Sequence, residues 1–173
     1  MTGKRVAAAA AALLVVALVA GASSPAGKAG AADQKTVTRT ITVPAGAFTA
    51  SDDNIDFVNG GNGLSTSSGG GTFAAALFLE SRDVTIKSIT LYATDNNAGE
   101  NVCLHLYRTT PWNAQEQKMG TVCSSGADLN PRAFNVNTLD YRKISGAYGP
   151  YLWVYLPTNV DLYFHAARLV YTY

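Results

Sequence analysis

The sequence is short of charge. Lysine, arginine, aspartate and glutamate make up 14% of its 173 residues, and the formal net charge is +1. A nucleic-acid-binding protein needs a basic surface, and here there is no surplus of basic residues to form one. The hydrophobic content of 47% is nevertheless that of a folded domain. We therefore expect a globular protein that does not bind nucleic acid.

Catalytic patterns are also missing from the sequence. No G-x-S-x-G turn is present to carry a nucleophilic serine. The two histidines, His105 and His165, lack the further clustered ligands that zinc requires. Glu80, Glu100 and Glu116 are scattered, without the pattern of a paired-carboxylate glycosidase. We expect a protein that is not an enzyme and has no cofactor, with a secreted hydrolase as the third-ranked alternative.

A long apolar run occurs once, at the start of the chain. Lys4 and Arg5 precede the apolar residues 6–20, and small residues follow them. This is the pattern of a secretion signal, and the run is shorter than the roughly 20 residues that span a bilayer. We predict a secreted, extracellular protein without a membrane anchor.

Two cleavage points fit the small residues after this run. One suitable triplet ends at Ala22 and a second ends at Ala31, so that cleavage could occur after residue 22 or as late as residue 31 or 32. We expect a signal peptide over residues 1–22, with cleavage at the later point as the alternative, and one β-sandwich domain over residues 33–173. Loss of the leader would bring the net charge near −2.

The remaining chain has the residue pattern of an all-β domain. No segment after the leader shows a helical apolar period, whereas apolar and polar residues alternate in many short segments separated by glycine, proline and asparagine. Strands are predicted over 36–43, 73–79, 84–91, 102–107, 118–124, 132–136, 139–144 and two terminal segments, with a long loop over 45–72 and a β-bulge at Lys87-Ser88. We predict a two-sheet antiparallel β-sandwich, with a jelly roll as the favoured topology. An immunoglobulin-like sandwich is the alternative, although the Cys, Trp, Cys order of that fold is missing.

Only two cysteines are present, Cys103 and Cys123. In an exported chain two cysteines form a disulfide more often than a catalytic thiol. We expect them to face each other on neighbouring antiparallel strands, with Leu104 opposite Val122 and Tyr107 opposite Met119.

A weak calcium candidate lies in the predicted loop. Asp52, Asn54 and Asp56 occupy alternate positions, as the first ligands of a calcium loop do. Phe57 stands where such a loop needs glycine, and Gly63 where it needs glutamate. Capping of a tight turn explains the three residues more simply, so no metal is assigned.

The C-terminal strand from residue 151 to 156 has two apolar faces of different character. Leu152, Val154 and Leu156 alternate with the rings of Tyr151, Trp153 and Tyr155. Other strands repeat the mixture of tyrosine and histidine, and two aromatics fall in loops. The full set of candidate interface or ligand-binding residues is Tyr107, Trp112, Tyr148, Tyr151, Trp153, Tyr155, Tyr163 and His165.

Three interpretations of this aromatic surface remain open. The rings could be covered by a second layer of the same chain. They could form a contact between subunits, where tyrosine and tryptophan are enriched. They could also be a platform on which sugar rings stack. We expect a non-catalytic domain that acts through the aromatic sheet face, either by binding a ligand or by self-assembly, for example into trimers. A carbohydrate-binding module is the alternative. The expected partners are a second copy of the chain and a glycan or cell-surface ligand.

Several segments of the chain resemble a known group of proteins. VPAGAF, SDDNIDF, DVTIKSITLY, CLHLYRTTP and the ending YLWVYLPTNVDLYFHAARLVYTY are similar to those of small uncharacterised secreted bacterial proteins with a β-sandwich fold. The layout also resembles, more remotely, the jelly rolls of C1q and tumour-necrosis-factor domains. The second resemblance implies trimers that assemble through an aromatic sheet face.

Overall fold

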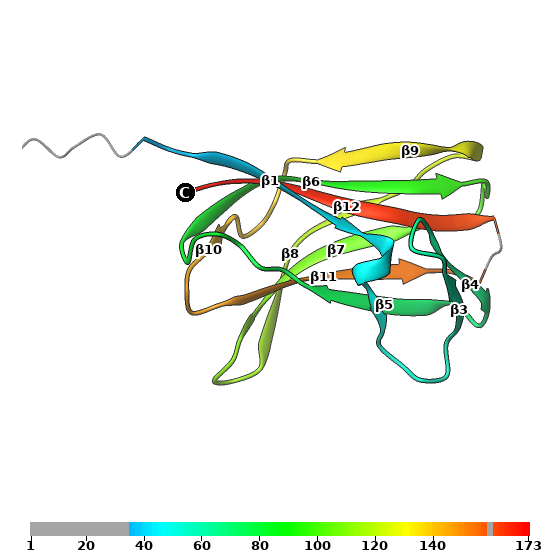
Figure 1. Cartoon of the computed structure of the whole chain (residues 1–173), viewed down its shortest axis with the longest axis horizontal. Helices are drawn as coiled ribbons and strands as arrows, with labels where there is room; N and C mark the ends of the chain where they lie inside the picture. The colour runs from blue at the N-terminus through cyan, green and yellow to red at the C-terminus, as the bar shows by residue number, and fades with distance from the viewer. Residues whose placement is uncertain (1–34, 159–160) are drawn as a thin grey trace, which may run out of the picture. The chain divides into compact units, whose positions relative to one another are not determined.

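The computed structural model describes residues 35–158 and 161–173 (Figure 1). The expected signal peptide, both cleavage points and residues 33 and 34 lie outside the described residues. Within the described ranges the chain forms these elements: β1 (Thr38–Pro44), η1 (a 3-10 helix, Ala45–Ala47), β2 (Thr49–Ala50), β3 (Asp56–Asn59), β4 (Leu64–Ser68), β5 (Gly71–Ala76), β6 (Val84–Asp95), β7 (Cys103–Thr110), β8 (Gln115–Cys123), β9 (Asp128–Val136), β10 (Lys143–Ile144), β11 (Gly149–Leu156) and β12 (Leu162–Thr172). Among these residues no helix has the length and apolar character needed to cross a membrane.

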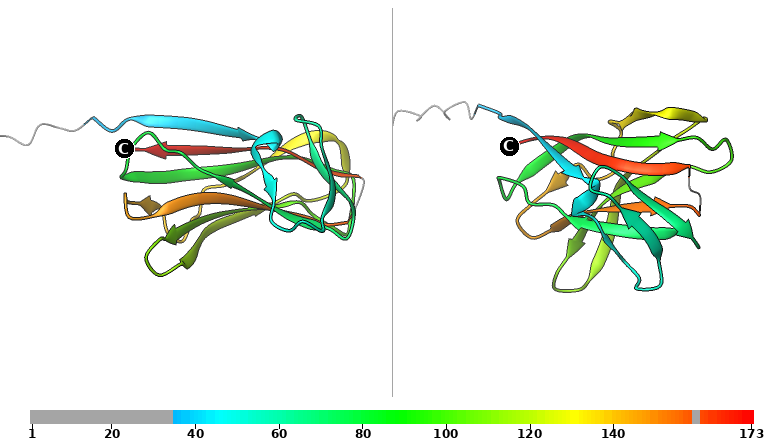
Figure 2. Two further views of the ribbon diagram at one scale, coloured as in Figure 1. Left: turned by 60° about the horizontal axis from the view of Figure 1, so that its bottom comes forward. Right: turned by 45° about the vertical axis from the view of Figure 1, so that its right-hand side comes forward.

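The strands form two antiparallel sheets that face each other as two layers (Figures 1 and 2). Sheet A has seven strands, with β1, β12, β6 and β9 side by side and β3, β4 and β10 added at its edges. Sheet B has five strands in the order β2-β5-β11-β7-β8. The predicted two-sheet antiparallel sandwich is therefore confirmed.

The order of the longer strands identifies the topology. In sheet A the order is β1-β12-β6-β9, and in sheet B it is β5-β11-β7-β8. The last strand of the chain thus lies between the first and the sixth, and β11 lies between β5 and β7. These nested antiparallel connections form a jelly roll, as expected, and not the alternative immunoglobulin arrangement.

The core lies between the sheets and follows from the alternation of side chains along each strand. On β11, Leu152, Val154 and Leu156 are fully buried. Leu104 and Leu106 of β7 lie beside them, again fully buried. The aliphatic face of the C-terminal segment therefore points into the sandwich, as the sequence predicts.

Two features of the strand pairing bear on the sequence-based predictions. Val170 pairs with Ser88 while the next residue, Tyr171, pairs with Ile86, so Lys87 is the extra residue of a β-bulge. The predicted bulge is thus confirmed. The loop predicted over 45–72 is wrong in part, because it contains the hairpin of β3 and β4, which joins an edge of sheet A.

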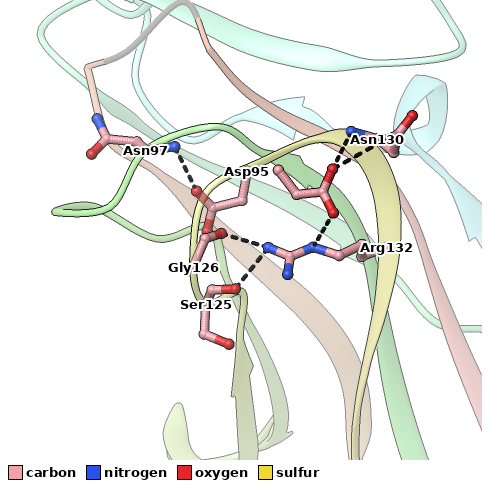
Figure 3. A network of polar contacts seen from close by, with 7 residues as sticks. Asp95, Asn97, Ser125, Gly126, Asn130 and Arg132 are labelled. Atoms are coloured by element: carbon pink, nitrogen blue, oxygen red, sulfur yellow. Dashed lines mark hydrogen bonds and ion pairs between the residues drawn. The ribbon is translucent and has the colours of Figure 1, made fainter.

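A polar network closes the end of the sandwich where β6 and β9 meet (Figure 3). Arg132 of β9 donates from Nη2 to the carbonyl oxygens of Ser125 and Gly126. Its Nε lies 3.8 Å from a carboxylate oxygen of Asp128, a distance typical of an ion pair rather than a hydrogen bond. Two backbone amides donate to carboxylates at the same end of the sandwich: Asn97 N, just after β6, to Asp95 Oδ1, and Asn130 N of β9 to Asp128 Oδ1. The network fixes the turn between β8 and β9.

Candidate functional site

The outer face of sheet B carries a cluster of rings. Tyr151, Trp153 and Tyr155 alternate with the buried aliphatic residues of β11 and therefore point away from the core. On β7, Tyr107 pairs with Tyr151 and His105 pairs with Trp153. These five residues are called the aromatic face below.

Small residues on β5 leave space beside these rings. Ala74 pairs with Trp153, and Ala76 pairs with Tyr151, on the side opposite to β7. Ala74 and Ala76 both point outward, and Ala74 forms the low side of a hollow. This hollow has a volume of about 330 Å³ and is called the aromatic groove; it is lined by Ser51, Ala74, Tyr107, Glu116, Tyr151 and Trp153.

The rings that line the aromatic groove have different orientations. Tyr107 and Tyr151 are stacked, with centroids 5.3 Å apart and planes 12° from parallel. Trp153 is nearly perpendicular to Tyr107, at a centroid distance of 6.0 Å and an angle of 79°. A ligand in the groove can therefore meet the face of one ring and the edge of another.

A carboxylate completes the groove on the β8 side. The Tyr151 hydroxyl donates a hydrogen bond of 2.7 Å to Oε1 of Glu116. Burial, together with this bond, raises the pKa of the Tyr151 phenol. Burial and the nearby Glu116 charge also raise the pKa of Tyr107. Both phenols therefore stay protonated. Tyr151 uses its single proton in the bond to Glu116, and the Tyr107 hydroxyl can act as a donor at the rim of the groove.

His105 extends the aromatic face away from the groove. Its Nδ1 lies 2.8 Å from Oγ1 of Thr121 on β8. Burial lowers the pKa of His105, and the positive charge of Lys118 lowers it further. At neutral pH the ring is therefore uncharged, and it packs 5.4 Å from the Trp153 ring.

The predicted disulfide is confirmed and lies on the same face. Cys103 and Cys123 are paired across β7 and β8, with Cα atoms 4.1 Å apart. Cys103 also pairs with Tyr155 of β11. The disulfide thus joins the two strands beside the outermost ring of the aromatic face, and such a bridge is typical of proteins in oxidising compartments.

The register beyond the disulfide differs from the prediction. Leu104 faces Val122 as expected, but Tyr107 faces Lys118 and not Met119. The pairing slips by one residue between Leu106 and Tyr107, because β8 has an extra residue there. The slip turns Met119 into the core, where it is fully buried. It also places Lys118 on the outer face of sheet B beside Tyr107.

The other four candidate residues lie elsewhere. Trp112 is in the turn between β7 and β8, where its side chain is 68% exposed. Tyr148 was expected in an exposed loop, but it packs against the core, and its ring is covered by the Arg108 guanidinium at 4.3 Å. Tyr163 and His165 lie on the outer face of sheet A. Of the predicted set, the fold gathers Tyr107, Tyr151, Trp153 and Tyr155 on sheet B, and Tyr163 and His165 separately on sheet A.

Tyr163 and His165 border a second hollow, of about 430 Å³, on sheet A. His165 Nδ1 lies 2.8 Å from the carbonyl oxygen of Asn62, so this nitrogen is the donor. Nε2 is then left to accept a hydrogen bond from the Thr94 hydroxyl, which is 2.8 Å away. Both ring nitrogens are thus engaged with the protein, and the ring acts as a fixed wall of this hollow.

The calcium candidate has the contacts of a capped turn. Oδ1 of Asp52 accepts hydrogen bonds of 2.9 Å from both the backbone and the side-chain nitrogen of Asn54. Such local bonds explain the Asp and Asn residues without an ion. In the part of the chain that the structure describes, no three His, Cys, Asp or Glu residues gather to form a metal site.

Sequence reasoning missed three residues that line the groove: Ser51, Ala74 and Glu116. Glu116 alternates with Lys118 on β8, and this pattern could have placed it on the outer face. Ser51 and Ala74 give no comparable signal, because only the pairing of β2, β5 and β11 places them beside Trp153.

Comparisons with known proteins find similarity in structure alone. No family model matches the chain, and no curated protein matches its sequence.

Similar solved structures include the CBM36-1 domain of a xylanase from the hindgut metagenome of Trinervitermes trinervoides. It has a TM-score of 0.49 and 11% identity, and the match covers 76% of this chain and 96% of the other. The CBM22-2 xylan-binding domain of Paenibacillus barcinonensis Xyn10C has a TM-score of 0.46, 11% identity and coverage of 76% and 98%. A CBM35 from Cellvibrio japonicus Abf62 has a TM-score of 0.42, 12% identity and coverage of 77% and 92%.

These three structures are carbohydrate-binding modules by description. They do not show the expected likeness to C1q and tumour-necrosis-factor domains. At identities of 11–12% a function does not transfer, so the function of this chain has to be sought in its own side chains.

Proposed function

We propose that the domain is a carbohydrate-binding module without catalytic activity, and that the aromatic groove is its binding site. One observation carries the proposal: three rings and a carboxylate, contributed by three neighbouring strands, line one concave hollow on an otherwise regular sheet. Sugar rings have apolar C–H faces and polar rims. An aromatic ring can stack on the C–H face of the sugar, while tyrosine hydroxyls, Ser51 and Glu116 bind its polar rim.

The shape of the groove favours a small or linear ligand over a protein surface. Tyr107, Tyr151 and Trp153 are only partly exposed, and alanines leave the space in front of the rings open. A flat contact between subunits would instead present rings that project from the sheet. A hollow with a few polar groups at its rim is the usual form of a small-molecule site.

The two tryptophans allow a direct binding test. Trp153 lines the groove, whereas Trp112 lies in the turn between β7 and β8 and is not among the lining residues. In a Trp112→Phe variant, Trp153 is the only remaining tryptophan, so its fluorescence reports on the groove. We expect soluble oligosaccharides from chitin, chitosan, cellulose or xylan to change that emission in a saturable way.

Pull-down on insoluble polysaccharides provides the mutational test. Trp153→Ala should reduce retention at least about fivefold, because each lost stacking contact contributes about 1 kcal/mol or more. Tyr163→Ala, on the opposite sheet, is the matched control and should be retained like the wild type. If no polysaccharide retains the wild type, or if Trp153→Ala is retained equally well, the proposal is wrong.

Self-assembly is the second candidate function. It is favoured by Phe78, which is 85% exposed just beyond β5, and by Tyr155, which is 43% exposed on the aromatic face. Aromatic side chains are enriched at subunit contacts, although these two lie towards opposite ends of β5 and not in one patch. Light scattering should give the mass of a dimer or trimer that Phe78→Ser reduces to a monomer. A monomer at micromolar concentration would exclude this function and leave glycan binding unaffected.

A further inference from the structure

Glu116 is the charged side chain among the residues that line the aromatic groove. The other lining residues are a serine, an alanine, two tyrosines and a tryptophan. A carboxylate is negatively charged at neutral pH and accepts hydrogen bonds but cannot donate them. The Tyr151 hydroxyl satisfies one acceptor position, at Oε1. A carboxylate oxygen has more than one acceptor site, so a ligand donor can bind alongside the tyrosine.

The rings that surround this carboxylate favour a positive charge as well. The faces of Tyr107, Tyr151 and Trp153 carry negative electrostatic potential and attract cations within about 6 Å of the ring centre. Three aromatic rings and one carboxylate around a hollow form the kind of site that holds an ammonium group. A neutral sugar would use the rings and could donate hydrogen bonds to Glu116, but it would bring no opposite charge to the carboxylate.

Lys118 is the charged group that opposes this preference. It lies on the outer face of sheet B, opposite Tyr107 and two residues from Glu116 on β8. It does not line the groove, whereas Glu116 does. The groove therefore has a negative group at its rim and a positive one outside it. A cationic ligand is expected to bind on the Glu116 side.

We propose that the aromatic groove selects saccharides that carry a protonated amine, such as chains of glucosamine units, over neutral saccharides of the same shape. The inference rests on the proposed glycan-binding function and specifies its ligand class. In the bound state the ammonium group donates to Glu116 and lies against the rings, while the sugar ring stacks on Trp153 or Tyr151.

Three hexasaccharides test this inference because they share one backbone. Cellohexaose, the N-acetylglucosamine hexamer and the glucosamine hexamer differ at carbon 2, which carries a hydroxyl, an acetamide or an ammonium group. Affinities are measured by titration calorimetry or by Trp153 fluorescence in the Trp112→Phe background. We expect the glucosamine hexamer to bind about fivefold or more tighter than the other two at low salt, with the difference decreasing as salt rises.

Substitutions at the rim of the groove test whether its charge or its shape determines the affinity for the glucosamine hexamer. Glu116→Gln should weaken binding of the glucosamine hexamer about three- to tenfold and leave binding of cellohexaose within about twofold. Lys118→Gln should tighten binding of the glucosamine hexamer, because it removes a repelling charge. Glu100→Gln, an exposed site in the turn before β7, is the matched control and should change neither affinity.

The outcomes distinguish this inference from the proposed function. Equal affinity for the three hexamers, or tighter binding of a neutral one, overturns the inference and leaves glycan binding in place. Failure of all three to bind overturns both. Free choline is a second source of an ammonium group, so binding of choline without binding of any hexamer also overturns the inference, because the ligand is then not a sugar.

Discussion

Trp153 of β11 is paired with Ala74 of β5, so the largest side chain of the aromatic face has one of the smallest as its neighbour. The groove exists because of this difference in size. Ala74 presents only a methyl group to the outer face, and the space above it is bounded by the tryptophan ring. A larger residue at position 74 would occupy that space without reaching the core.

We predict that Ala74→Leu abolishes ligand binding without unfolding the domain. The added atoms occupy the hollow of about 330 Å³ and should reduce affinity at least about tenfold. Outward-facing substitutions usually change the free energy of unfolding by less than about 0.5 kcal/mol. Ala133→Leu, on the exposed face of β9 in sheet A, is the control for a larger exposed residue. If Ala74→Leu binds like the wild type, the ligand lies elsewhere.

We predict that loss of the disulfide lowers stability more than it lowers affinity. Cys103 and Cys123 are 20 residues apart, and a bridge of this span contributes roughly 3 kcal/mol. For a domain of this size the double variant Cys103→Ser, Cys123→Ser should melt on the order of 10 °C lower. At low temperature its affinity for the ligand should stay close to the wild-type value, since neither sulfur lines the groove. Differential scanning calorimetry under oxidising conditions provides the measurement, and unchanged melting would contradict the prediction.

We predict that His105 makes stability depend on pH between 5 and 7. Its pKa in the folded chain is below the ordinary value of 6.5, owing to burial and Lys118. The unfolded chain therefore binds a proton more readily, and stability that is complete above pH 6.5 decreases as the pH falls toward the folded pKa. His105→Gln keeps a polar partner for Thr121 and cannot titrate. Its melting temperature should decrease less between pH 7 and pH 5 than that of the wild type.

The carboxylates of Glu80 and Asp128 do not affect this comparison of melting temperatures between pH 5 and pH 7. The pKa values of Glu80 and Asp128 are lowered by their hydrogen-bond partners, so their contribution to stability is lost only below their ordinary pKa values of 4.5 and 3.8. A His105→Gln variant whose melting temperature follows the wild-type profile across pH 5 to 7 would show that another group titrates there.

We predict that Arg108→Lys destabilises the domain by about 1–2 kcal/mol. The guanidinium lies 4.7 Å from the ring centre of Tyr141 and 4.3 Å from that of Tyr148. It also donates to the Gln117 side chain and to the carbonyl oxygen of Lys143. A lysine keeps the charge but cannot stack or donate in this planar arrangement.

Chemical denaturation of Arg108→Lys gives the measurement, with the exposed Arg142→Lys as its control. Arg142 makes a single hydrogen bond to a backbone carbonyl, so we expect its replacement to change stability by about 0.5 kcal/mol or less. Equal effects of the two substitutions would mean that the stacked tyrosines add nothing.

The sequence predicts the all-β class and the aromatic side of β11 because both follow from a period of two. The alternation of Leu152 and Val154 with Trp153 can be seen within six residues, and the structure places the aliphatic residues inside. The disulfide is predictable for a similar reason, since an exported chain with two cysteines leaves one pairing.

The groove itself is not predictable in this way. It depends on which strand lies beside β11, and the sequence does not specify that β5 brings Ala74 next to Trp153. The prediction that Tyr148 is exposed is wrong for a related reason. Its turn position indicates exposure, but Arg108 from β7 covers its ring. The one-residue slip at Tyr107 is equally hidden, because either register keeps a plausible set of apolar neighbours.

The pairing of β1 with β12 has a practical consequence for experiments. Val37 and Tyr173 exchange two backbone hydrogen bonds at the margin of sheet A, whereas the aromatic groove opens from sheet B. A linker or biotin attached after Tyr173 would hold the domain on a sensor by the layer that faces away from the groove. Protein immobilised in this way should therefore leave the groove accessible to dissolved sugar.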